Sequence, residues 1–275
     1  MSSTQRNTNR QYSGTVRLAS LDVLANVPVG DAYWQITLAA ASEHTAATPG
    51  QFFHLACPPS SLGEPFLRRP MSIYCADPAR AQIEFLYKVT GAGTCGLSTL
   101  VPGKSLSVLG PLGVGFRIDD HLRHALIVAR GVGIATMAPL AQKLAKANVA
   151  LTTIWSGRSP ESAIGQDRFE PYGDFYSVFD SDQTSSLRSV ELLIESIDQE
   201  HEIDAIYACG SQRLARLLRP FADRHNLLAQ VALEQQMACG LGMCHACVID
   251  RTVNGQVESA RVCTVGPVFD LSETT

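Results

Sequence analysis

Residues 239–247 read CGLGMCHAC, and a fourth cysteine, Cys263, follows after fifteen further residues. The spacing C-x4-C-x2-C with a distant fourth cysteine is typical of plant-type [2Fe–2S] sites. A loop that wraps a cluster closely must turn without a Cβ clash, and Gly240 and Gly242 allow positive φ at such turns. The sequence therefore predicts a [2Fe–2S] site with four thiolate ligands, Cys239, Cys244, Cys247 and Cys263.

Two other kinds of metal site fit this pattern less well. Structural zinc prefers four thiolates from two short paired knuckles, whereas here three cysteines share one loop; zinc stays as the alternative to the cluster. A Rieske centre replaces two cysteines with histidines, so with four cysteines present His245 is expected to be a bystander. Cys57, Cys75 and Cys95 show no metal-like spacing, and we expect none of them to be an iron ligand.

The region before this loop, residues 119–233, shows alternating strands and helices. Residues 124–129 form an apolar run typical of a buried strand, and a helical period then places Met137, Leu140, Ala141 and Leu144 on one face. Further strands are expected at 149–155, 175–179, 205–209 and near Val231, and further helices at 187–197 and 212–225. Such alternation predicts a doubly wound α/β domain with a parallel sheet.

A glycine-rich turn with Gly131 and Gly133 joins the first of these strands to a helix expected from about Ala135. A turn of this kind can bind the diphosphate of a dinucleotide at the helix N-terminus. Taken alone, the turn is also compatible with an ordinary strand-to-helix connection of an α/β domain.

Residues 10–118 read as short strands separated by Gly and Pro turns. Strands are expected at 16–24, 33–38, 51–57, 70–75, 82–89 and 105–110, with no helix between them. Such a run is typical of a closed barrel or a sandwich. Residues 234–275 form a third region, which is too short to bury a core of its own. Such a region needs an additional stabilising feature, such as a bound metal.

Two short motifs in the strand-rich region suit a diphosphate ligand. Arg69-Pro-Met-Ser72 offers the rigid donor fork of an arginine. Gly91-Ala-Gly-Thr94 offers a turn whose N–H groups can surround phosphate oxygens. Each motif alone is also compatible with a plain strand entry or a loose turn.

Composition argues against two classes of partner. The net charge of −4 is mild and no basic block occurs, so nucleic acid is not expected as a ligand. Residues 1–14 are polar and lack the apolar run of a signal peptide. No stretch reaches the roughly 18 apolar residues that a membrane helix needs. We therefore expect no membrane partner and a cytoplasmic location, where thiols stay reduced.

The order of these motifs resembles that of the ferredoxin–NADP reductase superfamily. The motifs are Arg69–Ser72, Gly91–Thr94, Gly110–Phe116, the glycine-rich turn, Ala208–Gly210 and residues 239–247, which we call the cysteine loop. With the cysteine loop at its C-terminal end, the chain is similar to the electron-transfer subunits of heterodimeric dihydroorotate dehydrogenases. The resemblance covers residues 12–269, and its most specific part is CGLGMCHACV followed by VCTVGPVF.

The resemblance implies an antiparallel β-barrel that binds FAD, an α/β domain that binds NAD(P), and a small [2Fe–2S] domain. Arg69 would bind the flavin phosphates, Ser72 would lie near the ring, and Gly93 and Thr94 would close over the diphosphate. The implied FAD-binding residues are Arg69, Pro70, Met71, Ser72, Leu86, Tyr87, Lys88, Gly93 and Thr94, and the implied nicotinamide-binding residues are Gly131, Gly133, Cys209 and Gly210.

Some positions depart from the superfamily pattern. Met71 stands where many ferredoxin reductases have Tyr, which favours the dihydroorotate branch. Arg130 replaces a usual third Gly and could pair with a phosphate or hinder its approach, and Ser211 replaces a usual Pro. Arg158 is placed to meet a 2′-phosphate, but NAD enzymes of this type often have a basic residue there too. NAD and NADP both stay open, and the resemblance favours NAD.

The resemblance also implies the function, electron transfer between a partner redox subunit, the cluster, FAD and NAD(P), as in the dihydroorotate dehydrogenases of pyrimidine biosynthesis. The partner would be a flavin-containing catalytic subunit. No acid, base or nucleophile is expected in this chain, because the cofactors carry the chemistry. Two alternatives stay open: an NAD(P)H-dependent reductase component for another oxygenase or flavoenzyme, and a zinc-stapled binding protein without redox function.

The cysteine loop also carries candidates for a partner interface, Leu241, Met243 and His245. An electron can leave a cluster near the surface only if another redox centre docks there. Exposed Leu and Met side chains would form a small apolar patch suited to docking. The alternative is that Leu241 and Met243 fold inward and shield the cluster.

Overall fold

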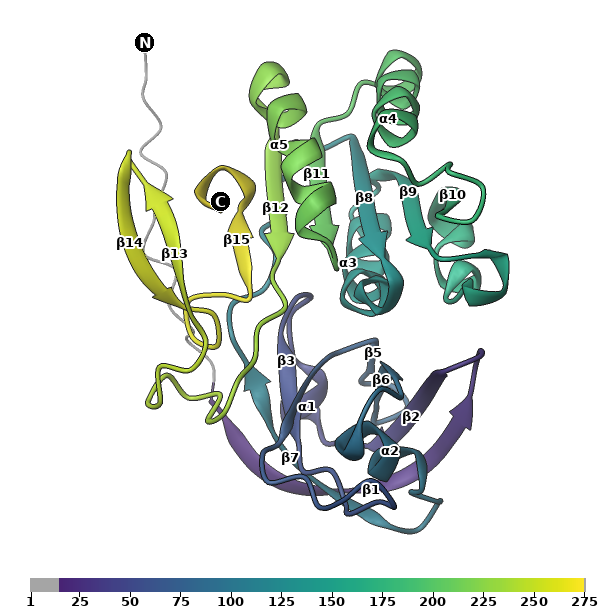
Figure 1. Cartoon of the computed structure of the whole chain (residues 1–275), viewed down its shortest axis with the longest axis vertical. Helices are drawn as coiled ribbons and strands as arrows, with labels where there is room; N and C mark the ends of the chain where they lie inside the picture. Colours follow the sequence, from purple (N-terminus) through teal and green to yellow (C-terminus); the bar gives the residue numbers. More distant parts are fainter. Residues whose placement is uncertain (1–14, 275) are drawn as a thin grey trace.

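The computed structural model describes residues 15–274, which form two large sheets and a C-terminal hairpin (Figure 1). The seven-stranded sheet lies below the six-stranded sheet in this view, and the hairpin lies at the left. The polar segment 1–14, with the expected start of the barrel region at residue 10, lies outside the described residues. Within the described part, no helix is long and apolar enough to cross a membrane.

The seven-stranded antiparallel sheet curls so that its two edges approach each other. Its strands are β1 (Arg17–Pro28), β2 (Tyr33–Ala39), β3 (Phe52–Leu55), β4 (Arg69–Ser72), β5 (Cys75–Asp77), β6 (Gln82–Lys88) and β7 (Ser105–Leu112). In the order β4-β3-β7-β1-β2-β6-β5, the edge strands β4 and β5 are joined by only Ile73 and Tyr74. Apolar side chains such as Phe53 and Leu55 of β3 fill the inside of the curl. This region is therefore a curled antiparallel half-barrel.

The expectation of six strands without a helix in this region is wrong. Residues 70–75 form parts of two strands rather than one, and helices α1 (Ser42–Thr45) and α2 (Ala92–Ser98) connect strands. Within α2, a Cβ on Gly96 would lie 1.9 Å from the Pro58 carbonyl oxygen, so tertiary packing requires glycine there. Helices this short show no helical periodicity in the sequence.

The six-stranded sheet has helices on both faces. Its order is β10-β9-β8-β11-β12-β15, with β8 (His124–Arg130), β9 (Ala150–Gly157), β10 (Gly173–Phe179), β11 (Ala205–Cys209) and β12 (Leu228–Ala232) parallel and β15 (Val268–Asp270) antiparallel. Helix α3 (Ile134–Lys146) packs on one face, and α4 (Leu187–His201) and α5 (Gln212–His225) pack on the other. The expected apolar face of α3 is confirmed, since Met137, Leu140, Ala141 and Leu144 are fully buried. The strand order reverses between β8 and β11, which is where open α/β sheets bind ligands.

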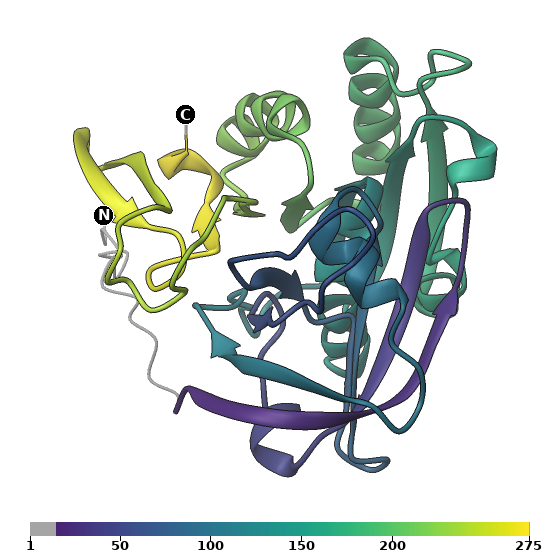
Figure 2. The same cartoon turned by 60° about the horizontal axis from the view of Figure 1, so that its bottom comes forward.

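The C-terminal residues are tied to both large sheets. Strands β13 (Val248–Val253) and β14 (Gln256–Arg261) form a hairpin after the cysteine loop, and β15 then joins the six-stranded sheet. Phe52 and Leu112 of the half-barrel pack with Cys247, Cys263 and other buried side chains in one small hydrophobic core. The cysteine loop therefore lies against the half-barrel, as Figure 2 shows from a second direction.

Candidate cofactor sites

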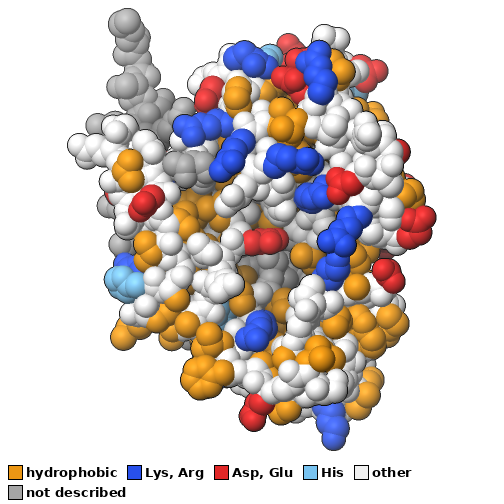
Figure 3. Space-filling view, viewed as in Figure 1, with side chains coloured by type: hydrophobic (Ala, Val, Ile, Leu, Met, Phe, Trp, Pro, Cys, Tyr) orange, Lys and Arg blue, Asp and Glu red, His pale blue; other side chains and the backbone are white. Residues whose placement is uncertain are grey.

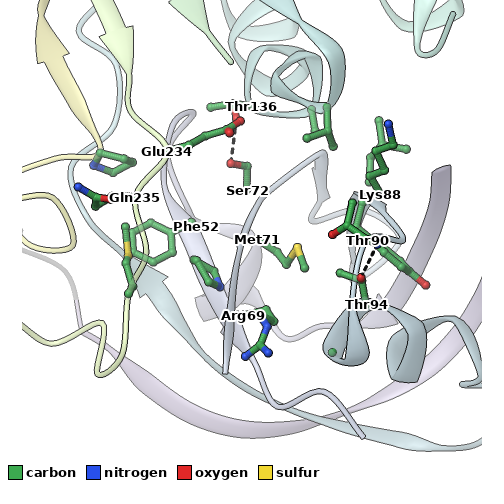
Figure 4. A pocket seen from close by; sticks show the side chains of 18 of the residues that line it. Phe52, Arg69, Met71, Ser72, Lys88, Thr90, Thr94, Thr136, Glu234 and Gln235 are labelled. Atoms are coloured by element: carbon green, nitrogen blue, oxygen red, sulfur yellow. Dashed lines mark hydrogen bonds between the residues drawn. The ribbon is translucent and has the colours of Figure 1, made fainter. Parts of the chain in front are cut away.

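A cavity of ≈ 430 Å³ lies between the two large sheets, which is within the size range of small-molecule sites. All nine residues that the resemblance assigns to FAD, from Arg69 to Thr94, line this cavity. Their individual roles stay predictions. The α/β unit and the segment after β12 supply the opposite wall, which includes Met237. Figure 4 shows Thr136 and Glu234 on this wall, and the sequence analysis identified none of these three residues.

At one end of the cavity, Arg69 lies against the glycine-rich turn of the second motif. A Cβ on Gly93 would lie 2.9 Å from the Arg69 Nε, so the absence of a side chain lets the arginine lie this close. In Figure 4, Arg69 and Thr94 lie in the lower part of the cavity, whereas Ser72 and Thr136 lie in the upper part. Two motifs that are separate in sequence thus form one surface with an arginine charge, which suits a diphosphate.

At the other end, a chain of hydrogen bonds joins three elements. The Thr136 hydroxyl of α3 donates to the Ser72 hydroxyl of β4 (2.8 Å), and the Cys209 thiol of β11 donates to Thr136 (3.5 Å). Burial and the nearby Glu234 carboxylate raise the pKa of Cys209 to about 12, so this group is a neutral thiol at neutral pH. The chain connects the expected flavin motif to the expected nicotinamide strand.

The Glu234 carboxyl group faces the same end of the cavity, next to Thr136 (Figure 4). Surrounding protein raises the pKa of this carboxyl group, although the side chain keeps solvent access through the cavity. One signal in the sequence could have identified Glu234 as a residue of the site. Glu234 follows the parallel strand β12 at the carboxyl edge of the sheet, where such sheets bind ligands.

The four residues assigned to the nicotinamide dinucleotide meet where β8 and β11 end. Between β8 and α3 the chain makes a 3-10 turn, Gly131–Gly133. A Cβ on Gly133 would lie 2.9 Å from the Cys209 carbonyl oxygen, and one on Gly210 would lie 2.3 Å from the Arg130 carbonyl oxygen. The glycines therefore allow the two strand ends to approach at the reversal of strand order, the position at which such sheets bind dinucleotides.

Arg130, which replaces the usual third glycine, is not a free charge at this turn. Its guanidinium group donates to the Asp180 carboxylate at 2.6 and 3.2 Å and to the Ser156 hydroxyl at 2.7 Å. Hydrogen bonds from Arg130 and Ser185 lower the pKa of Asp180 to about 2. Arg130 thus ties the carboxyl ends of β8, β9 and β10 together, with its charge neutralised.

The four cysteines expected to bind iron come together as two pairs. The Cys244 N–H donates to the Cys239 Sγ (3.4 Å), and the Cys263 N–H donates to the Cys247 Sγ (3.5 Å). The thiols within each pair also interact, and Cys263 interacts electrostatically with Cys239 of the other pair. Burial and the adjacent Cys247 thiol raise the pKa of Cys263 to about 12.

The backbone of the loop points its amides at a thiol. Although burial opposes the effect, N–H groups of Cys244 and Leu241 lower the pKa of Cys239 to about 7. The turn that aims these amides has positive φ at Gly240 (+70°) and Gly242 (+77°), which confirms the conformation expected from the sequence.

This pairwise arrangement fits two irons better than one zinc ion. A structural zinc site needs four donors around one ion, whereas a [2Fe–2S] cluster distributes its four thiolates over two irons. The pairs Cys239–Cys244 and Cys247–Cys263 suit the second case.

The tip of the cysteine loop is exposed. Leu241 is 48% exposed and Met243 is 80% exposed, so the alternative in which both fold inward is wrong. Cys244 is exposed as well. Figure 3 shows hydrophobic side chains gathered at the lower left of the molecule, in the view of Figure 1. The loop therefore presents apolar side chains and one of the four sulfurs to the outside.

The half-barrel, the α/β unit and the C-terminal cysteine loop together define a protein with a ferredoxin reductase-like fold. A chain of an NADH-dependent reduced ferredoxin-NADP oxidoreductase matches with a TM-score of 0.76 and 26% identity, over 96% of this chain and 91% of its own. The ferredoxin-NADP+ reductase from Plasmodium falciparum shares the fold with a TM-score of 0.57 and 13% identity, over 75% of this chain and 89% of its own.

Sequence relatives narrow this class to one family. Residues 234–275 match the family model described as the iron-sulfur cluster binding domain of dihydroorotate dehydrogenase B. The electron transfer subunits of dihydroorotate dehydrogenase B (NAD(+)) from Streptococcus pneumoniae (strain ATCC BAA-255 / R6) and Geobacillus sp. (strain WCH70) are 32% and 31% identical to this chain. Each match covers 92% of this chain, and 97% and 96% of the relatives. The chain belongs to the family of dihydroorotate dehydrogenase B electron transfer subunits.

Proposed function

We propose that the chain is the electron-transfer subunit of a dihydroorotate dehydrogenase and links a flavin-containing catalytic partner to NAD in pyrimidine biosynthesis. The observation that carries this proposal is the meeting of three sites. The cavity adjoins the β8–β11 edge through Thr136. It also adjoins the buried side chains under the cysteine loop, including Cys247 and Cys263, through Phe52. The names of the relatives supply the substrate class and the choice of NAD.

FAD fits the cavity by the chemistry of its walls. Arg69 beside Gly93 would bind the diphosphate, and the hydroxyl groups of Ser72 and Thr136 would lie beside the ring. When bound, FAD exchanges two electrons with a nicotinamide and single electrons with an iron–sulfur cluster. The protein's part is to bind, orient and exclude water, and no side chain of this chain is proposed as an acid, base or nucleophile.

The remaining assignments follow the same geometry. The dinucleotide would bind at Gly131, Gly133, Cys209 and Gly210, and the [2Fe–2S] cluster at Cys239, Cys244, Cys247 and Cys263. We assign FAD binding to residues 10–118, NAD(P) binding to 119–233 and the cluster to 234–275. We also propose a cytoplasmic location, where the thiols would stay reduced.

The test is anaerobic purification of the chain alone and with a dihydroorotate dehydrogenase catalytic subunit. Visible absorption and chemical analysis should find flavin, iron and acid-labile sulfide. NAD+-dependent oxidation of dihydroorotate should require both subunits. A colourless protein that contains zinc would contradict the proposal and support the zinc-stapled alternative.

A reductase component for another redox partner is a second candidate, favoured by the structural match to the NADH-dependent reduced ferredoxin-NADP oxidoreductase. This function would use the same cofactors and differ only in the partner. A chain that holds flavin and iron, reduces dyes with NADH, and yet fails to couple with any dihydroorotate dehydrogenase catalytic subunit would favour this candidate.

A further inference from the structure

His54 in β3 is a buried polar side chain without a partner. It is 0% exposed, and neither ring nitrogen makes a hydrogen bond to any residue in 15–274. An unpaired buried polar group is costly, so native proteins rarely keep one without a reason such as a bound ion or cofactor. The location of the ring indicates which group would pair with it.

The ring lies directly under the cysteine loop. Alternate residues of a strand face opposite sides, and Phe53 and Leu55 face the inside of the half-barrel. Phe52 and His54 therefore face the C-terminal segment, and Phe52 packs there with the buried Cys247 and Cys263. A Cβ on Gly240 would lie 3.1 Å from the His54 Cε1 and 3.2 Å from its Nδ1. Glycine at position 240 thus gives the imidazole access to the loop.

The same ring is next to the flavin motif. In the β3–β4 ladder, His54 is paired with Pro70 of the motif Arg69–Ser72. The nearby Arg68 donates to the His54 carbonyl and to Ser107, not to the ring. Burial and the Arg68 charge lower the pKa of His54 to about 4, which leaves a neutral ring with one N–H to donate at neutral pH.

We propose that His54 donates a hydrogen bond to a sulfur of the iron–sulfur cluster and thereby raises its reduction potential. Hydrogen bonds to the sulfurs are one of the factors that set the potential of such clusters. A donor favours the reduced cluster, which carries more negative charge. This inference rests on the cluster assigned under the proposed function.

His44 provides an internal comparison. It is also buried, and both of its ring nitrogens are unpartnered within the described part of the chain. Its ring lies 6.3 Å from that of Phe53, which faces the inside of the half-barrel. The missing partner alone therefore does not identify a cluster ligand or donor, and the contact with Gly240 distinguishes His54.

The experiment is a redox titration of the cluster, followed by electron paramagnetic resonance, in the purified subunit complex. His54→Phe removes the donor, His54→Gln keeps an N–H, and His44→Phe is the matched control. We expect His54→Phe to lower the midpoint potential by about 59 mV, corresponding to a tenfold change in a one-electron equilibrium. His54→Gln should lie closer to the parent, and His44→Phe should match it. A parental potential in His54→Phe with full iron content would overturn the inference.

A second measurement does not depend on the folding of the His54 variants. Pulsed magnetic resonance of the reduced cluster in a His245→Gln protein with 15N-labelled histidine should show a coupling to an imidazole nitrogen. The His245→Gln change removes the histidine that belongs to the loop itself, so that a coupling would not come from it. No coupling in an iron-loaded sample would overturn the inference, whereas a parent protein without iron would overturn the proposed function instead.

Discussion

Two adjacent arginines differ in what their guanidinium groups contact. Arg68 donates to the Ser107 hydroxyl and carbonyl groups, both at 2.9 Å. Arg69 donates to the Leu67 carbonyl group and lines the cavity beside Gly93. Of the two, only Arg69 is therefore placed to meet a ligand in the cavity. Arg68 carries the same charge outside the cavity and is the matched control.

Arg69→Ala should weaken FAD binding about tenfold to a hundredfold, because a charge-assisted hydrogen bond contributes roughly 1.5–3 kcal/mol. Equilibrium dialysis of FAD against the apoprotein measures the effect. Arg68→Ala should reduce stability while leaving FAD affinity near the parental value. If both variants keep FAD as tightly as the parent, Arg69 does not anchor the phosphates.

The cysteines can be tested as two sets. Serine at Cys239, Cys244, Cys247 or Cys263 should each reduce the iron content, since Ser is a far poorer ligand for iron than thiolate. The controls are Cys57→Ala, Cys75→Ala and Cys95→Ala in the half-barrel, which should keep iron and sulfide at the parental level. Loss of iron in any control would show that the ligand set is wrong.

At the scale of elements, local periodicity decided what was predictable. Helix α5 and strand β11 begin and end at the expected residues, because their apolar patterns lie within one element. The break between β4 and β5 depends on the curl of the whole sheet, which no local pattern records. The residues that line the cavity were likewise predictable only where the signal is local. The two half-barrel motifs could be identified from sequence, whereas Thr136 and Glu234 reach the cavity only through packing between distant elements.

The ion pair of Arg130 and Asp180, which joins the ends of β8 and β10, should stabilise the α/β unit in a pH-dependent way. The folded pKa of Asp180 is about 2, below its ordinary value of 3.8, so the carboxylate is favoured in the folded state. The contribution of the ion pair to the free energy of unfolding is complete above about pH 4 and is lost as the pH falls towards about 2. Asp180→Asn should therefore lower the free energy of unfolding at neutral pH, and the difference from the parent should shrink with acidification.

Chemical denaturation of both proteins at several pH values between about 3 and 7 measures this difference. Asp120→Asn is the control, because Asp120 is an exposed carboxylate just before β8 whose side chain forms no ion pair within residues 15–274. A parent–variant difference for Asp180→Asn that does not change with pH would show that the ion pair is not its cause.

At the scale of the whole molecule, the cysteine loop presents both apolar side chains and one of the four sulfurs to the outside. The cavity lies between the two sheets, whereas Leu241 and Met243 are exposed, and so is Cys244 between Met243 and His245. Electron transfer to a second protein needs a short path from a centre to the contact surface. The loop offers such a path together with apolar side chains that a partner can bury.

Met243→Glu should therefore slow electron transfer to the catalytic partner, because a carboxylate would have to be desolvated in the contact. NADH-dependent reduction of a small dye through FAD should stay near the parental rate, since the cavity and the β8–β11 edge are unchanged. Stopped-flow measurement of both reactions separates the two effects. Leu192→Glu is the control, because Leu192 is a comparably exposed apolar side chain (48%) on α4, far from the loop in Figure 1. If Leu192→Glu slowed partner reduction as much as Met243→Glu, or if Met243→Glu left it unchanged with full iron content, the partner would have to dock elsewhere.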